Sequence, residues 1–344
     1  MSGRVVTFGE LLLRLKAPGQ ERLLQSPLLE ATFGGGEANV AVSLCRLGLR
    51  ASYVTALPEG PVGDAALRCL RGHGVDTAHV RRRPGRMGIY FLEGGADLRA
   101  SAVLYDRAGS AAAAMAPGDF PWRDILPGAD WFHVSGITPA LSRSAADATL
   151  EAVSAAHGAG VRVSVDLNYR RKLWAYGVAA PEVMRPLATL ADVLVGNEED
   201  LQLALGMAVT GADPSRGKVD PEAYREMAGQ ALALFPQVKR VAITLRQSRS
   251  ADRNAWSAIL VGRDGYQISR AYELEDIVDR IGGGDAFAAG LIYGLLELGG
   301  EAEALEFATA ASALKHTVPG DFNLVDRAEV QRLLGGETSG RVSR

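Results

Sequence analysis

The chain has 344 residues, of which 47% are hydrophobic and 22% charged. These proportions are typical of a globular protein long enough for one large α/β domain or two ordinary ones. A formal net charge of −3, from 37 basic and 40 acidic residues, gives no electrostatic reason to expect nucleic acid or an anionic membrane as a partner. The short basic run at residues 81–83 is interpreted as a solvated loop.

The cysteines and the N-terminal residues indicate a cellular location. Cys45 and Cys69 fall in predicted helices without metal-ligand spacing, so we expect reduced core thiols. The first residues lead into a strand without the apolar region of a signal peptide, and no apolar run is long enough to span a bilayer. The sequence therefore predicts a cytoplasmic protein.

The first hundred residues combine a buried strand, a helix fed by glycines and a small sheet. Residues 4–8 read as a buried strand, and residues 16–32 as irregular or hairpin structure. Three glycines then precede an apolar helix over residues 40–47. The alternation at 87–93, answered by 102–105, predicts a β-hairpin outside the α/β rhythm. We therefore expect one domain over residues 1–344, with a lid of about residues 11–33 and 86–108 inserted in it.

From residue 130 onward, predicted strands and helices alternate. Strands are expected at 131–134, 161–165, 192–195, 240–245 and 257–261, and helices at 142–159, 181–190, 198–205, 223–235, 286–298 and 301–316. This alternation predicts a three-layer, doubly wound α/β fold, whose mostly parallel sheet is covered by helices on both faces.

Polar residues recur just after the carboxyl ends of these strands, at the edge where open α/β sheets bind ligands. They are Ser135, Asp166, Asn168, Arg170, Asn197, Thr244, Arg246 and Asp285.

A glycine turn before one predicted helix carries the clearest chemical signal. Gly282, Gly283 and Gly284 lead into Asp285 and an apolar run at helical spacing. Glycines let main-chain N–H groups approach an anion, and the helix start adds unpaired N–H groups and the positive dipole end. The turn thus predicts a site for a phosphate in transfer, with Asp285 beside the acceptor hydroxyl. It matches neither G-x-G-x-x-G nor a Walker loop. Because Asp is also a favoured N-cap, a purely structural role stays open.

Two glycine motifs resemble the signatures of the ribokinase-like, or phosphofructokinase B-type, carbohydrate kinases. One is Gly35-Gly36-Glu37-Ala38-Asn39-Val40-Ala41 with Gly48 downstream, and the other is residues 279–290. Residues 88–91, 105–111, 135–141 and 166–170 are similar to the 2-keto-3-deoxygluconate kinase branch. The resemblance covers nearly the whole chain. It implies the ribokinase-like fold with a lid, and ATP-dependent phosphorylation of the terminal C6 hydroxyl of 2-keto-3-deoxygluconate.

The resemblance implies a role for each part of the glycine turn. Asp285 would be the catalytic base, and the amides of Gly282, Gly283 and Gly284 would hold charge on the transferring phosphoryl group. A carboxylate of ordinary pKa is a weak base for an alcohol. We therefore expect proton transfer to come late, with positioning and charge stabilisation supplying most of the rate enhancement.

On the nucleotide side, the resemblance implies a set of ATP-binding residues, namely Asn197, Thr244, Arg246, Gly282, Gly284 and Lys315. Asn197, Glu199 and Asp200 match the Asn-x-x-Glu element that organises Mg²⁺ through water. Asp200 is one methylene shorter than the family's Glu, so Glu199 is an alternative. A need for a monovalent cation stays open. Arg280 stands where the family has a small or β-branched residue, and it either meets the phosphates or points to solvent. Residues 246–254 are interpreted as an insert after a strand.

On the substrate side, a sugar acid carries a carboxylate, for which Arg is the natural partner. The resemblance points to Arg107 and Arg170, with hydroxyls from Tyr90 and Tyr105 of the lid. The alternatives are a surface salt bridge for Arg107 and lid packing for the tyrosines. The remaining expected contacts are Gly35, Gly36, Asn39, Ile137 and Asp321.

Other functions stay open at this stage. They are a fructokinase- or ribokinase-like kinase of a neutral sugar, a non-catalytic sugar-binding protein, and a glycosidase acting on a nucleoside-like substrate. Dependence on ATP and Mg²⁺ separates the last two from a kinase. The exposed face of the lid, rich in Leu and Tyr, predicts a homodimer in which the lids meet.

Overall fold

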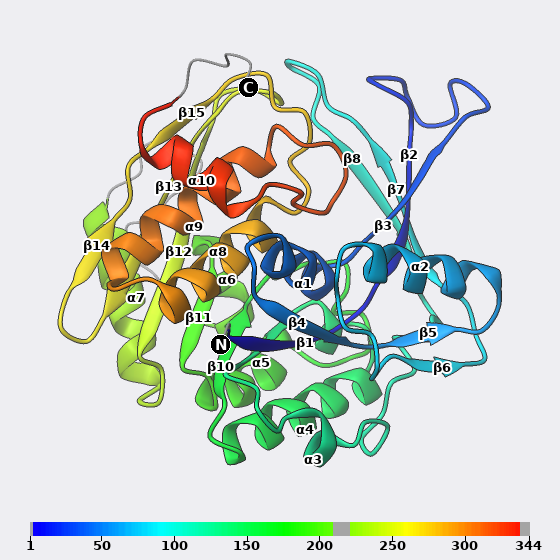
Figure 1. Cartoon of the computed structure of the whole chain (residues 1–344), viewed down its shortest axis with the longest axis horizontal. Coiled ribbons are helices and arrows are strands. Elements are labelled where there is room, and N and C mark those ends of the chain that lie inside the picture. Colours follow the sequence, from blue (N-terminus) through cyan, green and yellow to red (C-terminus); the bar gives the residue numbers. More distant parts are fainter. Residues whose placement is uncertain (1–2, 209–220, 338–344) are drawn as a thin grey trace.

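The computed structural model describes residues 3–208 and 221–337, and a nine-stranded sheet runs through it (Figure 1). Its order is β14-β13-β12-β11-β10-β9-β1-β4, with β15 paired to β13. The strands are β1 (Arg4–Phe8), β4 (Arg50–Val54), β9 (Trp131–Ser135), β10 (Arg162–Asp166), β11 (Val193–Gly196), β12 (Arg240–Ser248), β13 (Asn254–Gly262), β14 (Tyr266–Ile268) and β15 (Tyr272–Leu274).

Most of this sheet is parallel. Neighbours from β4 to β12 pair in parallel, and β13 runs antiparallel to β12, β14 and β15. Successive side chains of a strand enter opposite cores: Val5 packs in one, and Val6 and Phe8 pack in the other. Strands buried on both faces explain the continuous apolar runs, and the mostly parallel α/β prediction is confirmed.

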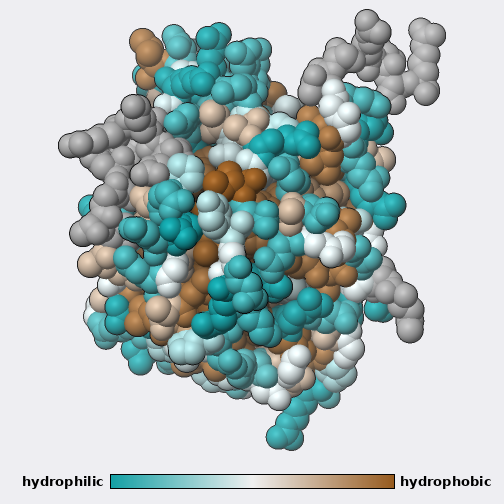
Figure 2. Space-filling model, turned by 90° about the vertical axis from the view of Figure 1, so that its left-hand side faces the viewer, coloured by the Kyte–Doolittle hydropathy of each residue, from teal (hydrophilic) through white to brown (hydrophobic). Residues whose placement is uncertain are grey.

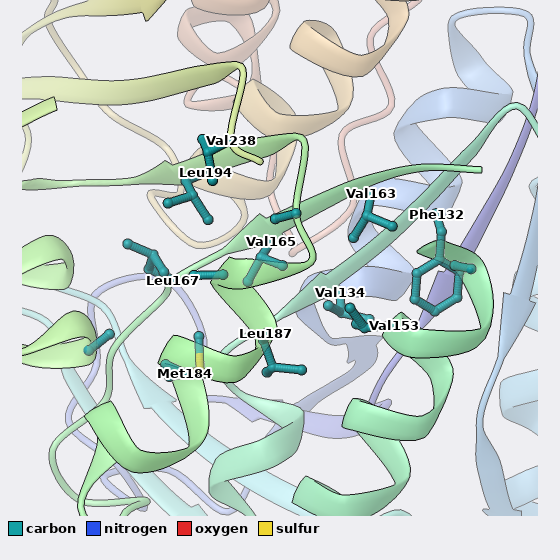
Figure 3. Packing of buried hydrophobic residues seen from close by; sticks show 14 of the residues in the cluster. Phe132, Val134, Val153, Val163, Val165, Leu167, Met184, Leu187, Leu194 and Val238 are labelled. Atoms are coloured by element: carbon teal, nitrogen blue, oxygen red, sulfur yellow. The ribbon is translucent and has the colours of Figure 1, made fainter. Parts of the chain in front are cut away.

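Helices cover both faces of the sheet. One layer comprises α1 (Gly36–Arg46), α2 (Pro61–Gly72), α8 (Gly283–Glu297), α9 (Glu301–Lys315) and α10 (Arg327–Leu334). The other comprises α3 (Trp122–Ile125), α4 (Arg143–Gly158), α5 (Ala180–Thr189), α6 (Glu198–Leu205) and α7 (Pro221–Leu234), with a 3₁₀ turn at Thr138–Ala140. Figure 3 shows part of the second core, in which Val163 and Val165 of β10 and Met184 and Leu187 of α5 belong to one cluster of buried side chains.

The helices leave a largely polar outer surface. Seen from the side of β14 and α9, hydrophilic residues cover most of the molecule and hydrophobic ones lie between them in small groups (Figure 2). Among the described residues, no helix combines the length and the apolar character needed to cross a bilayer.

A second sheet, here called the lid sheet, has the order β3-β2-β7-β8. It consists of β2 (Leu12–Lys16), β3 (Glu30–Gly34), β7 (Gly88–Glu93) and β8 (Ala102–Asp106), and stands at the upper right of Figure 1. The expected hairpin is present as β7 and β8, and residues 11–33 add the other two strands. This sheet brings Arg14, Tyr90 and Tyr105 to one side of the molecule.

Two local predictions are wrong. The strand expected over residues 240–245 is longer, because β12 continues to Ser248 and pairs through Arg246 with Trp256 of β13, so residues 246–254 form the end of a hairpin. Polar residues suit this part of the hairpin, where β12 becomes exposed. Residues 81–83 form β6 (Arg81–Arg83), paired in parallel with β5 (Ala56–Pro58). The arginines are neutralised by Asp64 and Asp119, which is why a basic run forms an ordered strand.

Candidate active site

The glycine turn forms the start of α8. Gly282, the N-cap residue, has a φ of 82°, and a Cβ there would lie 2.1 Å from the main-chain oxygen of Asp321. Only glycine fits such a position. A Cβ on Gly283 would meet the ring of His316 at 2.7 Å, whereas one on Gly284 would meet no atom of the described residues within 4 Å. Two glycines therefore let the turn pack closely, and the third leaves open space at the helix start.

Asp285 lies in the first turn of α8 and is 9% exposed. Its Oδ2 accepts a hydrogen bond of 2.6 Å from Nδ2 of Asn39, whose own Oδ1 accepts from the Gly35 amide at 3.1 Å. Burial raises the pKa of Asp285 to about 6, and the Asp321 carboxylate adds to this rise, while Asn39, Arg170 and Lys315 oppose it. The result is a fixed carboxylate whose proton affinity suits general-base chemistry near neutral pH.

A single cleft of about 870 Å³ is lined by Asp285, the glycine turn, Arg107 and Arg170. Asp285 and the two arginines, far apart in the chain, thus face one cavity, as the kinase hypothesis requires. Lys315 lies outside the lining. The other expected residues all line the cleft: Gly35, Gly36, Asn39, Tyr90, Tyr105, Ile137, Asn197, Glu199, Asp200, Thr244, Arg246, Gly282, Gly283, Gly284 and Asp321.

Arg107 is buried, which excludes the surface salt bridge considered from the sequence. Its Nη1 lies 3.3 Å from Oε2 of Glu10, and its guanidinium carbon stands 4.2 Å from the centre of the Tyr105 ring. Within the described part of the chain, Nε and Nη1 of Arg107 lack a hydrogen-bond acceptor. Glu10 is held by Ser110, whose hydroxyl donates to it at 3.0 Å. Arg107 is thus ion-paired with Glu10 through Nη1 and keeps hydrogen-bond donors that suit a second carboxylate, that of a ligand.

Arg170 and Ile137 stand elsewhere on the cleft. Arg170 is exposed, and its Nη1 donates to the carbonyl of Tyr169 at 2.9 Å. It also opposes the rise in the pKa of Asp166, which burial causes and the Asp200 and Asp285 carboxylates increase. Ile137 is half-buried and follows β9. The cleft therefore has a second cation beside its group of carboxylates.

Tyr90 and Asp321 are bonded to each other. The Tyr90 hydroxyl donates to Oδ1 of Asp321 at 2.5 Å, and Arg14 of β2 is paired with the same carboxylate at 2.6 Å. Arg14 also forms an ion pair with Asp279. Lys315 is fully buried, and its Nζ donates to the carbonyls of Asp279 at 3.3 Å and Val318 at 3.1 Å. Lys315 thus supports the glycine turn from behind.

The residues that match the Asn-x-x-Glu element form the cap of a helix. Asn197 is the N-cap of α6 and accepts from the Asp200 amide at 2.9 Å. The carboxylate of Asp200 accepts from the amides of Asn197 and Tyr169, at 2.9 and 2.7 Å. Both of its oxygens therefore already bind main chain. Glu199 is exposed and has no such bond among the described contacts.

A divalent cation near the start of α6 would need water or phosphate oxygens as ligands in addition to the protein's carboxylates. Among residues 3–208 and 221–337, no three His, Cys, Asp or Glu side chains gather closely enough to hold a metal. Mg²⁺ commonly binds one or two carboxylates and completes its shell with water and phosphate oxygens. Asp166, which is 6% exposed and lines the cleft, and Glu199 offer such carboxylates.

Arg280 is tied to the β12–β13 turn. Its Nη2 donates to the carbonyl of Ala251 at 2.6 Å, and the Ala251 amide donates to the carbonyl of Asp97 at 2.8 Å. Asp97 lies between β7 and β8. The residue that departs from the family signature therefore links the glycine turn to the tip of the lid sheet, and it also lines the cleft.

Sequence reasoning gave no role to Glu37 or Arg14. Glu37 is fully buried, and its Oε1 accepts from the Ser135 amide and hydroxyl, both at 2.8 Å. Burial raises its pKa to about 7, and the Asp285 carboxylate contributes to the rise. Arg14 had a visible signal, a lone charge in a run of leucines. Glu37 had none, because an acid in the first turn of a helix is common.

A mostly parallel α/β sheet, a glycine turn at a helix start and a buried carboxylate in a cleft with two arginines are the features of a phosphotransferase of the sugar-kinase type. The sequence profile of the pfkB family of carbohydrate kinases matches residues 2–326, and the chain belongs to this family.

Relatives of known name extend over the whole chain. A 2-dehydro-3-deoxygalactonokinase of Haloferax volcanii is 35% identical, with 99% of each chain covered. A 2-dehydro-3-deoxygluconokinase of Bacillus subtilis is 29% identical, covering 92% of this chain and 91% of the relative. The crystal structure of a 2-dehydro-3-deoxygluconokinase from Thermotoga maritima superposes with a TM-score of 0.91 at 45% identity, covering 97% of this chain and all of the other.

Proposed function

We propose that this protein transfers the γ-phosphoryl group of ATP to the terminal C6 hydroxyl of 2-keto-3-deoxygluconate (2-dehydro-3-deoxygluconate), giving its 6-phospho product. One observation carries the proposal: the glycine turn and Asp285 share a single cleft with Arg107 and Arg170. Arg107 meets Glu10 through Nη1, and a neutral sugar would bring no charged acceptor to its Nε donor. The names of the relatives agree with a keto-deoxy sugar acid as substrate.

Asp285 accepts the proton of the attacking hydroxyl. Asn39 holds one carboxylate oxygen, which leaves the other, Oδ1, for the substrate. With a pKa of about 6, Asp285 is mostly ionised at neutral pH. The proton moves onto it late, as the oxygen gains its bond to phosphorus. The amides of Gly282, Gly283 and Gly284 stabilise the charge on the transferring group at the start of α8.

Thr244 and Arg246 of β12 would meet the nucleotide phosphates, beside the N-terminal turn of α6. When bound with the nucleotide, Mg²⁺ neutralises phosphate charge and helps orient the transferring group. Asp166 and Glu199 would hold its water ligands, and Asn197 offers an amide donor. Because both oxygens of Asp200 accept main-chain amides, we propose that it shapes this turn and contacts the cation's water only through remaining lone pairs.

No added monovalent cation is proposed for the reaction. The Lys315 ammonium donates to the carbonyls of Asp279 and Val318 behind the glycine turn. This side chain therefore supplies the positive charge that a bound monovalent cation would bring to these carbonyls. Turnover in a sodium- and potassium-free buffer should equal turnover with added potassium. A strong activation by potassium would contradict this part of the proposal.

A coupled assay tests the proposed function. Purified protein, ATP and Mg²⁺ are supplied with 2-keto-3-deoxygluconate, its galactonate epimer, fructose and ribose in turn. We expect ADP formation with a keto-deoxy sugar acid and far slower turnover of the neutral sugars. Good turnover of fructose or ribose alone would instead support the neutral-sugar kinase. Sugar binding without ADP formation would support a binding protein, and product formation without ATP would support a glycosidase.

The lid sheet is the proposed interface of a homodimer. Leu24, Leu28, Leu98 and Leu104 of this sheet and its loops are 60% to 93% exposed. Apolar side chains gathered on an exposed sheet are typically covered by a partner. Sedimentation should give a dimer, and Leu104→Glu should give a monomer; a wild-type monomer at all concentrations would contradict the interface. Free thiols at Cys45 and Cys69 support a cytoplasmic location.

A further inference from the structure

Arg14 is a charged side chain in the interior of the protein. It comes from β2 of the lid sheet, is 2% exposed and is among the largest fully buried side chains of the described residues. It forms ion pairs with Asp279 and Asp321, which are 6% and 3% exposed. Burying an ion pair is a weak way to stabilise a fold, because the desolvation penalty offsets the attraction and apolar residues often serve as well. The arrangement therefore calls for another explanation than stability.

Both partners of Arg14 hold the glycine turn. Asp279 accepts from the Ile281 amide at 3.1 Å, just before Gly282, and from the Gly320 amide at 3.1 Å. The main-chain oxygen of Asp321 packs so closely on Gly282 that a Cβ there would come within 2.1 Å. Arg14 thus joins the two segments that shape the turn. A second lid-sheet residue, Tyr90 of β7, donates to Asp321 as well.

The charges around Asp285 make this contact important for the reaction. The carboxylates of Asp321, Glu37 and Asp166 face it from different elements, and the cations Arg170 and Lys315 oppose them. Arg14 neutralises Asp321 and Asp279 directly. Without Arg14, the Asp321 carboxylate would act on Asp285 without this ion pair, and Lys315 would be a cation still close to both Asp279 and Asp321.

We propose that Arg14 is a positioning residue of the phosphoryl transfer: by bridging Asp279 and Asp321 it lets the lid sheet, when closed over the cleft, set the shape of the glycine turn and the charge around Asp285. The substrate arginines Arg107 and Arg170 bind the sugar in this view, and Arg14 acts without touching it. The inference rests on the proposed kinase function, and it predicts that catalysis and lid closure are linked through one guanidinium.

Three variants test this proposal. Arg14→Met removes the charge, Arg14→Lys keeps the charge without the two-pronged geometry, and Arg86→Met is the matched control. Arg86 precedes β7 and pairs with Asp106 at the exposed edge of the same sheet. Steady-state kinetics are measured from pH 5 to 9 with the best sugar acceptor of the wild-type protein. Circular dichroism and urea unfolding establish that each variant is folded.

We expect Arg14→Met to lower kcat by about 100-fold and to change the KM for ATP much less. A small displacement of the glycine turn disturbs the alignment needed for phosphoryl transfer more than it disturbs ATP binding. The acidic limb of its pH profile should move up by about half a unit or more, since Asp321 is no longer neutralised. Arg14→Lys should lower kcat by about tenfold and leave the limb in place. Arg86→Met should match the wild-type protein.

A folded Arg14→Met with kcat within threefold of wild type, or with an unmoved acidic limb, would overturn the proposal. If Arg14→Met fails to fold, Arg14→Lys decides: a wild-type kcat overturns it, and a reduced kcat with an unchanged limb supports it. The assay of the wild-type protein with several sugars distinguishes a failure of the proposed kinase function from a failure of the proposed role of Arg14. A wild-type protein that phosphorylates none of the sugars refutes the kinase function, whereas the Arg14 effects are read only against an active wild type.

Discussion

Replacing the proposed base, Asp285→Asn, should abolish catalysis and stabilise the fold. Burial raises the pKa of Asp285 from 3.8 to about 6. At 1.36 kcal/mol per pKa unit, the folded protein disfavours the ionised carboxylate by on the order of 3 kcal/mol. Since the folded pKa is the higher one, this group's contribution to stability is fully present below pH 3.8 and is lost as the pH rises through about 6. A neutral Asn avoids that loss.

Urea unfolding at pH 8 should therefore give Asp285→Asn a free energy of unfolding about 1 to 3 kcal/mol above that of the wild-type protein. The difference should shrink as the pH falls toward 5. The kcat should drop by about 1,000-fold, with sugar binding retained in calorimetry. Asp147→Asn, an exposed ion-pair partner of Arg143, controls for the substitution itself. A lower stability of Asp285→Asn than of the wild-type protein at pH 8 would refute the reasoning. A difference in their free energies of unfolding that did not change with pH would refute it as well.

Four further predictions follow from the same contacts. The kcat/KM of the wild-type protein should fall below about pH 6 as Asp285 takes up its proton, which a pH profile with the sugar acid measures. Glu37→Gln should leave this limb close to its wild-type position, because burial raises the pKa of Glu37 to about 7 and its carboxyl is mostly protonated, and so neutral, at the pH of the limb. Gly284→Ala should fold normally and lose ATP turnover, whereas Gly283→Ala should unfold at lower urea, since its methyl meets His316. Arg107→Met should lower kcat/KM for the sugar acid by about 100-fold and leave residual turnover of neutral sugars unchanged.

The sequence predicted what local patterns encode. The alternation of strands and helices, the lid hairpin and the glycine turn before α8 all depend on residues close together in the chain. Arg246 shows the limit of such patterns: the expected strand ends at residue 245, yet β12 continues through polar residues, because this part of the strand is exposed and needs no apolar side chains.

The bonds that hold the site were beyond such reasoning. Asn39 and Asp285 are 246 residues apart, and Arg14 and Asp321 are 307 apart. Residue types and motif spacing told which groups belong to the cleft, because strand ends gather at one edge. They did not predict that Asn39 donates to Asp285, or that Tyr90 donates to Asp321. Such hydrogen bonds depend on differences of a few tenths of an ångström in how the elements pack, which residue types do not encode.

The charge pattern of the cleft favours a particular form of the nucleotide. Asp285 raises the pKa of Glu37, and Asp285 and Glu37 both raise the pKa of Asp166, so negative charge is already unfavourable in this region. ATP without a cation would add further negative charge beside them. A nucleotide with bound Mg²⁺ brings compensating positive charge to Asp166 and Glu199. Free ATP should therefore bind far more weakly than the Mg²⁺ complex, and Asp166→Asn should narrow that difference in titration calorimetry.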